Sequence, residues 1–289
     1  MTIKQSELIL NDDGSVYHLN LKPEHIANTI IFVGDQYRVD KVTNYFDSIE
    51  FSTQKREFKT TTGVLNGRRI SVISTGIGPD NIDIVLNELD ALVNVDLTTR
   101  SPKSELTTLD IIRIGTSGSL QDYIPVDSLL LSSHAIDLNG MLHAYQTEAI
   151  SNPALENACV AHTNWSKKKA YPIVIENDSS LEERLSSPEV FKGITATAGG
   201  FYGPQGRVLR LPLQDSELNN KIDSFNFDGH QITNLEMETS AIYGLSKLLG
   251  HRACSMNAII ANRANGTFSE NSYQIVDDLI QYTLEKITL

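Results

Sequence analysis

The chain has 289 residues, a formal net charge of -12, 40% hydrophobic residues and a mean hydropathy of -0.19. This length, without a Pro/Gly/Ser-rich linker, predicts one domain over residues 1–289, and the acidic balance without a basic stripe argues against nucleic-acid binding. The lack of a long apolar run and of a signal-peptide core predicts a cytoplasmic protein with no membrane partner, and two distant cysteines predict no disulfide framework and no metal site.

Short apolar runs alternate with helical patterns along the chain. The runs expected to form strands are residues 30–33, 69–74, 111–114, 128–131, 194–198 and 253–260. Apolar residues have helical spacing over residues 82–92, 242–249 and 275–284. Gly250 is expected to end the second of these helices. This alternation predicts an α/β fold with a largely parallel or mixed sheet flanked by helices. The polar stretch 94–109 is expected to be an exposed loop, and residues 150–184 carry no interpretable motif.

Two glycine-containing segments at expected strand ends suggest a site for an anion. Gly34-Asp35-Gln36-Tyr37-Arg38 follows the first strand, and Arg113-Ile114-Gly115-Thr116-Ser117-Gly118 follows the third. Glycine permits close approach of the backbone, hydroxyl and N–H groups can cradle an anion, and arginine offers a planar fork suited to phosphate. Ligands of α/β sheets usually bind outside the carboxyl ends of strands, so both segments are predicted to be turns around one phosphate site. A lone arginine would more often be a surface or ion-paired residue.

An ordered set of motifs resembles the nucleoside phosphorylases of the hexameric type, and within them the uridine phosphorylases. The matching segments, spread over residues 16–287, are Gly34-Asp35-Gln36-Tyr37-Arg38, Arg56-Glu57-Phe58, Ser74-Thr75-Gly76-Ile77-Gly78, Arg113-Ile114-Gly115-Thr116-Ser117-Gly118, Gln205-Gly206-Arg207, Glu236-Met237-Glu238 and Asn262-Arg263. The resemblance implies a single α/β domain with a central mixed, partly barrel-like sheet. It also implies reversible phosphorolysis, in which uridine and phosphate give uracil and ribose 1-phosphate, with phosphate as co-substrate and no cofactor.

The resemblance assigns phosphate binding to Arg38, Arg56 and Arg113, with Gly34 and Thr116 as close donors. Charge-assisted arginine bonds can hold a phosphate in place against its own hydration. Arg38 and Arg113 are also favoured by their positions beside the glycine segments, whereas Arg56 lies on no recognisable turn and depends on the resemblance. In the family this arginine reaches across from a neighbouring subunit, which predicts a homo-oligomer: a dimer-based hexamer or a dimer.

The segment Glu236-Met237-Glu238 is the predicted ribose site. In an extended segment, residues two apart share a face, so both carboxylates could accept from sugar hydroxyls and stabilise an oxocarbenium-like transition state. The resemblance assigns the sugar contacts to Glu238 and the Met237 backbone. The plainer alternative is an acidic pair at a helix N-terminus, and the two are compatible. The resemblance also places His18 on the 5′-hydroxyl of a ribose bound by the partner subunit.

Gln205 and Arg207 are predicted to recognise the base. A glutamine amide offers a donor beside an acceptor, arginine adds donors for a carbonyl, and both would bind the anionic leaving base more tightly than the substrate. The local sequence alone favours a plain surface turn here. The resemblance reverses that preference, adds Phe201 as a stacking ring and assigns nucleoside contacts to Thr116 and Ser117. The expected catalytic residues are Arg113, Gln205, Arg207 and Glu238.

Asn262 favours a pyrimidine over a purine substrate. Purine members of the family typically have an aspartate there, as general acid for N7 of the base, and uracil has no N7. The alternatives that stay open are a purine nucleoside phosphorylase, a hydrolytic nucleosidase of the same fold and a non-catalytic nucleoside-binding homologue. A hydrolase would need a carboxylate base for water and would not need three phosphate-binding arginines.

Two departures from the family pattern affect the predicted site. Gln36 stands where the family usually has proline, which should loosen that turn. Pro79-Asp80-Asn81 replaces a common Gly-Pro-Ser type of turn, and this change puts in doubt the monovalent cation that some relatives bind nearby.

Overall fold

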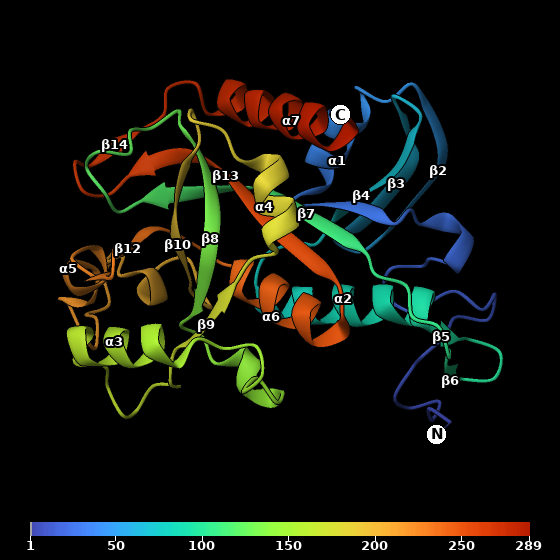
Figure 1. Cartoon of the computed structure of the whole chain (residues 1–289), viewed down its shortest axis with the longest axis horizontal. Helices are drawn as coiled ribbons and strands as arrows, with labels where there is room; N and C mark the ends of the chain where they lie inside the picture. The colour runs from blue at the N-terminus through green and yellow to red at the C-terminus, as the bar shows by residue number, and fades with distance from the viewer. Residues whose placement is uncertain (1) are drawn as a thin grey trace.

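The computed structural model describes residues 2–289 and contains one continuous mixed sheet of twelve strands. Five of these strands close into a barrel in the order β7, β13, β8, β10 and β12 (Figure 1). The closing pair is β12 with β7, antiparallel, where Leu235 lies opposite Gly118. From β7 the sheet continues outward through β1, β4, β3 and β2. The predicted α/β domain with a mixed, partly barrel-like sheet is therefore confirmed.

The strands of the main sheet are β1 Thr29–Val33, β2 Ser48–Lys55, β3 Phe58–Leu65, β4 Arg68–Ser74, β7 Asp110–Ser119, β8 Leu129–Asp137, β9 Ile173–Glu176, β10 Phe191–Thr197, β11 Asn226–Phe227, β12 His230–Glu236, β13 Arg252–Asn262 and β14 Thr267–Phe268. A separate hairpin consists of β5 Val95–Asp96 and β6 Ser101–Pro102. The α-helices within residues 2–289 are α1 Gln36–Thr43, α2 Pro79–Asn94, α3 Pro153–Thr163, α4 Ser179–Leu185, α5 Leu218–Asp223, α6 Thr239–Leu249 and α7 Ser272–Thr288.

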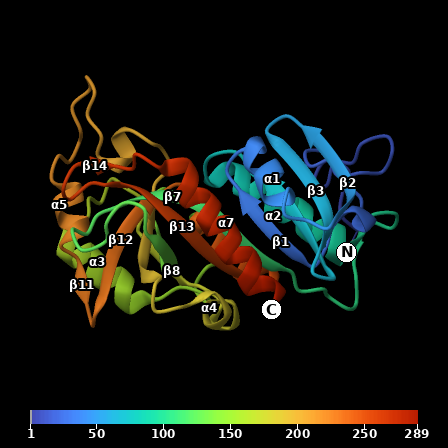
Figure 2. The same cartoon turned by 90° about the horizontal axis from the view of Figure 1, so that it is seen from above.

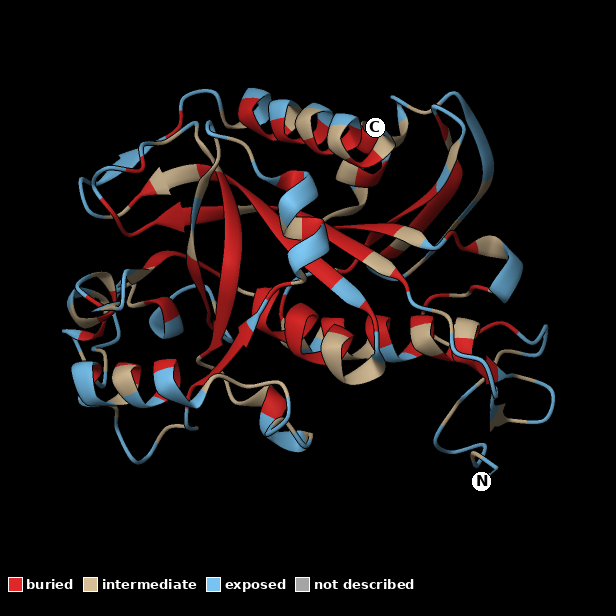
Figure 3. Cartoon of the chain, viewed as in Figure 1, coloured by how far each residue is buried: buried red, intermediate tan, exposed pale blue. Residues whose placement is uncertain are grey.

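The helices cover the sheet in layers. Helices α2 and α6 lie along one face, and α7 runs across the other between the barrel and the β1–β4 part (Figures 1 and 2). One apolar cluster joins the strands to α2 and α6, and a second joins them to α1, α4 and α7. The inward faces of the helices and most of the central strands are buried, while the outer faces are exposed (Figure 3). No helix within residues 2–289 is both long enough and apolar enough to cross a bilayer.

Helix ends agree with the predicted local chemistry. The Asp35 carboxylate accepts from the Arg38 backbone N–H and caps α1, so the helix begins at Gln36, inside the segment predicted to be a turn, and Arg38 lies in its first turn. Gly250 ends α6 in the left-handed conformation, which also agrees with the prediction. The helices predicted over 82–92 and 275–284 correspond to α2 and α7.

Three expectations about strands and loops need correction. The segment from Gly115 to Gly118 is not a turn, because β7 continues through it to Ser119. The stretch 94–109 is only partly an exposed loop: it contains the β5–β6 hairpin, and Asn94 and Leu109 at its ends are buried. Residues 150–184 hold α3, β9 and part of α4, and β9 extends the barrel wall by pairing with β8.

Candidate active site

A cavity of about 280 Å³ opens where the end of β12 meets the C-terminal half of β7. The predicted site residues that line it come from β7, β12 and the segments after β1 and β10: Gly34, Arg38, Arg113, Thr116, Ser117, Phe201, Gln205, Arg207, Glu236, Met237 and Glu238. The positions assigned to phosphate, sugar and base thus share one cavity. His18 and Arg56 do not line it.

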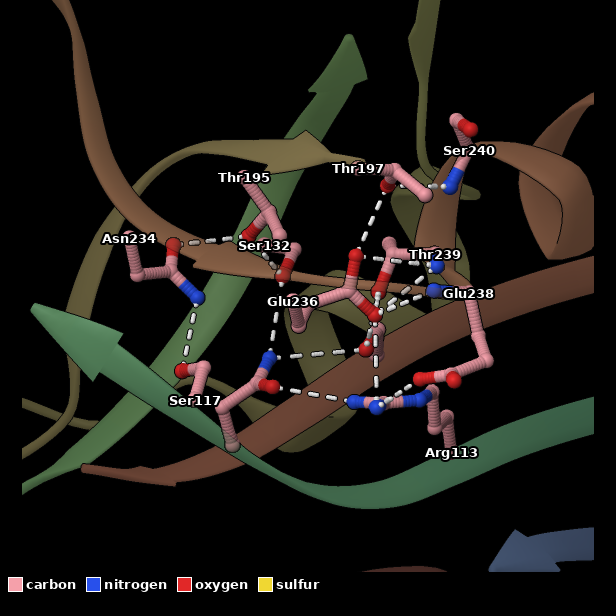
Figure 4. A network of polar contacts seen from close by, with 12 residues as sticks. Arg113, Ser117, Ser132, Thr195, Thr197, Asn234, Glu236, Glu238, Thr239 and Ser240 are labelled. Carbon is pink, nitrogen blue, oxygen red and sulfur yellow. Dashed lines mark hydrogen bonds and ion pairs between the residues drawn. The ribbon is translucent and has the colours of Figure 1, made fainter. Parts of the chain in front are cut away.

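Arg113 lies at the centre of a buried cluster beside the cavity. Its Nη2 is 2.7 Å from Glu238 Oε2 and 3.2 Å from Glu236 Oε2, and its Nη1 donates to Asn257 Oδ1 at 2.9 Å (Figure 4). These contacts use three of the five N–H groups of the guanidinium, and the other two have no bond within residues 2–289. Gly115 makes this arrangement possible, because a Cβ there would lie 1.8 Å from Arg113 Nη1.

The two carboxylates of the predicted ribose site have different surroundings. Glu236, at the end of β12, accepts from the backbone N–H groups of Glu238 and Thr239 and from the hydroxyls of Thr197 and Thr239. Glu236 therefore anchors the start of α6 to the barrel. Glu238 is the N-cap residue of α6, and among the described residues it accepts only from the Gly78 N–H and from Arg113. Since each carboxylate oxygen has two lone pairs, Glu238 retains capacity for a ligand.

Burial and neighbouring charges shift the pKa values of this cluster. Burial raises the pKa of the Glu238 carboxyl; Arg113 opposes this rise, and the negative charge of Glu236 adds to it. Burial alone would lower the pKa of Arg113, but the two carboxylates raise it. Arg113 therefore stays cationic, and Glu238 takes up a proton more readily than an exposed glutamate.

Arg38 supplies a second cation to the cavity. Its guanidinium pairs with Asp35 at 2.9 Å and donates to the Ile114 carbonyl at 3.3 Å. Burial lowers the pKa of Arg38, and the charge of Asp35 partly offsets that effect. The Asp35 carboxylate therefore both caps α1 and orients the Arg38 guanidinium. Asp35 was not among the site residues predicted from the sequence.

Arg56 and His18 are held outside the cavity of their own chain. Arg56 occupies the two-residue turn between β2 and β3 with φ of 56°, so the expectation that it lies on no turn is wrong. The Gln36 side chain donates to the Arg56 carbonyl and accepts from Gln54, so this non-proline residue ties the hairpin to the start of α1. His18 Nδ1 lies 2.6 Å from Glu88 Oε1, which leaves Nε2 as the ring nitrogen for any other partner.

Gln205 and Arg207 contact each other in the wall of the cavity. Arg207 Nη1 donates to Gln205 Oε1 at 2.5 Å and to the Phe201 carbonyl at 2.6 Å, and its guanidinium stacks 3.9 Å from the centre of the Phe201 ring. Gln205 is 3% exposed, so it is more than a residue of a surface turn. Arg263 holds the loop that contains Gln205, because its guanidinium donates to the Gln205 carbonyl at 2.6 Å.

Asn262 has a structural role in this chain. Its Nδ2 donates to the carbonyls of Gln121 and Ile124, and its Oδ1 accepts from the N–H groups of Ala264 and Asn265. Its side chain is not among those that line the cavity. Asn257, by contrast, contacts Arg113 directly and was not found from the sequence, because one polar residue inside an apolar strand gave no motif.

Comparisons with known proteins agree with this geometry. A family model of the phosphorylase superfamily matches residues 28–287, and the chain belongs to this superfamily. It is 30% identical over 259 residues to a uridine phosphorylase of Thermococcus kodakarensis, covering 90% of this chain and 82% of that protein. It is 29% identical over 261 residues to a uridine phosphorylase of Haemophilus influenzae, covering 86% of each chain. A Trypanosoma brucei nucleoside phosphorylase that shows uridine phosphorylase activity superposes with a TM-score of 0.88 at 29% identity, covering 96% of this chain and 98% of that one. The resemblance stated from the motifs is confirmed.

Proposed function

We propose that this protein is an enzyme that catalyses the reversible phosphorolysis of uridine to uracil and ribose 1-phosphate. The observation that carries the proposal is that Arg38, Arg113 and Glu238 line one cavity together with the pair Gln205–Arg207. The curated and solved relatives named above, which are uridine phosphorylases or show that activity, support the same substrate.

In the proposed mechanism each part of the cavity acts on one part of the substrates. Arg38, Arg113, Gly34 and Thr116 hold phosphate, and one of its oxygens forms a bond to C1′ as the C1′–N1 bond breaks. The electron pair of the broken bond goes to the base, whose carbonyls accept from Arg207 and from the Gln205 amide. This binding strengthens as negative charge develops, which is what lowers the barrier. Glu238 orients the sugar hydroxyls and stabilises the positive charge on the ring.

We further propose that His18 and Arg56 complete the cavity of a partner subunit. Both lie outside the cavity of their own chain, and both are fixed there by specific contacts, Glu88 for His18 and Gln36 for Arg56. The proposal predicts that mixing two inactive variants, Arg56→Ala and Arg38→Ala, restores part of the activity, because a mixed dimer contains one intact site. Activity that stays absent in an assembly shown to exchange subunits would contradict this sharing.

The function is tested by uracil release from uridine with and without inorganic phosphate. Phosphorolysis predicts release that depends on phosphate, with ribose 1-phosphate as the second product. Full turnover in phosphate-free buffer would instead indicate a hydrolase. Faster turnover of inosine than of uridine would indicate a purine enzyme, and calorimetric uridine binding without uracil release would indicate a non-catalytic homologue.

Glu238→Gln should lower kcat/KM for uridine by about 30-fold or more, since loss of a buried charged partner commonly costs about 2–5 kcal/mol. The carboxylate form is the active one, and burial raises its pKa above 4.5, the ordinary glutamate value. Activity should therefore fall on the acid side at a higher pH than that value implies, and Glu238→Gln should lose this acid limb. A pH profile of kcat/KM for both proteins measures this. An unchanged acid limb in the variant would assign it to another group.

Arg207→Ala should reduce kcat for uridine much more than it reduces thermal stability. Arg207 lies in a loop, and within residues 2–289 its guanidinium donates to the exposed Phe201 carbonyl and to the Gln205 side-chain oxygen. Its main contribution should come when the leaving base becomes negative, so kcat should fall more than KM rises. Steady-state kinetics and calorimetry on the same samples separate the two effects. Equal losses of activity and stability would indicate a structural role.

A further inference from the structure

A chain of hydrogen bonds starts at Arg113 and enters the barrel. Arg113 Nη1 donates to Asn257 Oδ1, and Asn257 Nδ2 donates to Ser132 Oγ at 3.2 Å (Figure 4). Asn257 lies opposite Gly115 in the β13–β7 register, so the missing side chain at Gly115 gives the guanidinium its path to the amide. A guanidinium can only donate, so the Asn257 amide must turn its oxygen toward Arg113 and its NH₂ toward Ser132.

The chain continues across two more strands and returns to β7. Ser132 Oγ contacts Thr195 Oγ1, and Thr195 donates to Asn234 Oδ1 at 2.8 Å. Thr195 and Asn234 are opposite each other in the β10–β12 register. Asn234 Nδ2 then donates to Ser117 Oγ at 2.9 Å. All five side chains beyond Arg113 are buried, and Ser117 lines the cavity.

The number of hydrogens on each group determines which atom donates in each hydrogen bond of this network. Thr195 gives its only hydroxyl hydrogen to Asn234 Oδ1, which cannot donate, so the hydrogen between Ser132 and Thr195 must come from Ser132. Thr233 Oγ1 lies 3.1 Å from Asn234 Oδ1 and 3.2 Å from the Ile194 carbonyl, so its one hydrogen is shared between these two acceptors. Every link therefore donates away from Arg113 and toward Ser117. Ser117 receives a hydrogen bond from Asn234, and its own hydrogen takes part in no other bond within residues 2–289.

We propose that Asn257 and Asn234 are positioning residues that make Ser117 a hydrogen-bond donor to the bound nucleoside. Without them the Ser117 hydroxyl could turn its lone pair toward the cavity as easily as its hydrogen. With them, the Asn234 amide occupies one lone pair of the Ser117 hydroxyl, and the Ser117 hydrogen stays available for a substrate atom that accepts, such as a carbonyl oxygen. This inference rests on the proposed function, since it specifies how the same cavity recognises its nucleoside.

The test is a double-mutant cycle between Asn234→Asp and Ser117→Ala, because aspartate has nearly the same shape but only accepts. In the Asn234→Asp variant, the introduced carboxylate would take the Ser117 hydrogen away from the cavity. Each single variant should raise KM for uridine by about fivefold to tenfold, the effect of one hydrogen bond, while KM for phosphate stays near its original value. In the Ser117→Ala background, Asn234→Asp should add nothing. Independent, multiplied effects would overturn the proposal, and so would a Ser117→Ala variant with unchanged KM.

Two controls separate this result from a loss of folding. Asn152→Asp makes the same chemical change at the cap of α3, where aspartate also caps, and should leave KM unchanged. If Asn234→Asp does not fold, Thr195→Val tests the preceding link with an isosteric side chain, and its effect should likewise disappear in the Ser117→Ala background. The cycle is also measured as Kd for uridine by calorimetry. If the unmodified protein binds uridine but does not cleave it, the proposed function alone is contradicted. If the effects of Asn234→Asp and Ser117→Ala are additive in free energy, only the proposed role of the hydrogen-bond network is contradicted.

Discussion

Gly115→Ala is expected to abolish most of the activity, lowering kcat/KM for uridine by about two orders of magnitude or more. The alanine Cβ would lie 1.8 Å from Arg113 Nη1 and 2.3 Å from its Cζ, so the guanidinium must move. Any movement breaks bonds to Asn257 and Glu238 that are 2.9 and 2.7 Å long. It would leave buried carboxylates without their cation and take a phosphate-binding group away from its place. Steady-state kinetics at varied phosphate measures the loss.

A glycine three residues along β7 gives the matched comparison. A Cβ at Gly118 would meet Arg263 Cδ at 3.6 Å, which is an ordinary van der Waals contact. Gly118→Ala should therefore have a much milder effect than Gly115→Ala, although both positions are strand glycines beside the same cavity. If Gly115→Ala kept its activity within about threefold, the present position of the Arg113 guanidinium would be irrelevant to catalysis.

Local chemistry explains which parts of the fold could be predicted. The stop at Gly250 and the apolar spacing of α2 and α7 depend on neighbours within one or two turns, and both were predicted. Glycine next to arginine indicated Arg113 as a site residue, and Arg113 does line the cavity, while its role in binding an anion stays a prediction. The reason was only half right, because Gly115 provides space for a side chain inside a strand and not a turn of the backbone.

The polar interior of the barrel explains what could not be predicted. Strand β8 was expected to end at residue 131 but continues to Asp137 through Ser132, Ser133 and His134, and β12 was not expected at all. Inside this barrel, side chains such as Thr195 and Asn234 satisfy one another by hydrogen bonds, so a buried strand shows no apolar run. Predicting strands from runs of apolar residues fails where the buried side chains of a strand are polar.

The positions of His18 and Arg56 show a limit of another kind. Both were predicted as site residues from the resemblance, and one folded chain holds them away from its own cavity. No pattern within a single sequence specifies the symmetry of an assembly. Their roles therefore stay predictions that depend on a second subunit.

Glu236→Gln is expected to destabilise the fold by about 3–5 kcal/mol, the usual cost of removing one partner from a buried ionic cluster. The Glu236 carboxylate accepts from two backbone N–H groups, from the Thr197 and Thr239 hydroxyls and from Arg113. An amide has only one oxygen, so its NH₂ group would face donors that it cannot satisfy. Because these bonds join the end of β12 to the start of α6, the loss should appear as a lower Tm at fixed protein concentration.

Glu238→Gln provides the contrast, since Glu238 accepts from one backbone N–H and from Arg113. Its Tm should stay closer to that of the unmodified protein, although both carboxylates are buried and contact the same guanidinium. This result would assign a structural role to Glu236 and a substrate-binding role to Glu238. Equal Tm losses in both variants would contradict this separation, because they would show that the charge near Arg113, and not the bonds to α6, determines stability here.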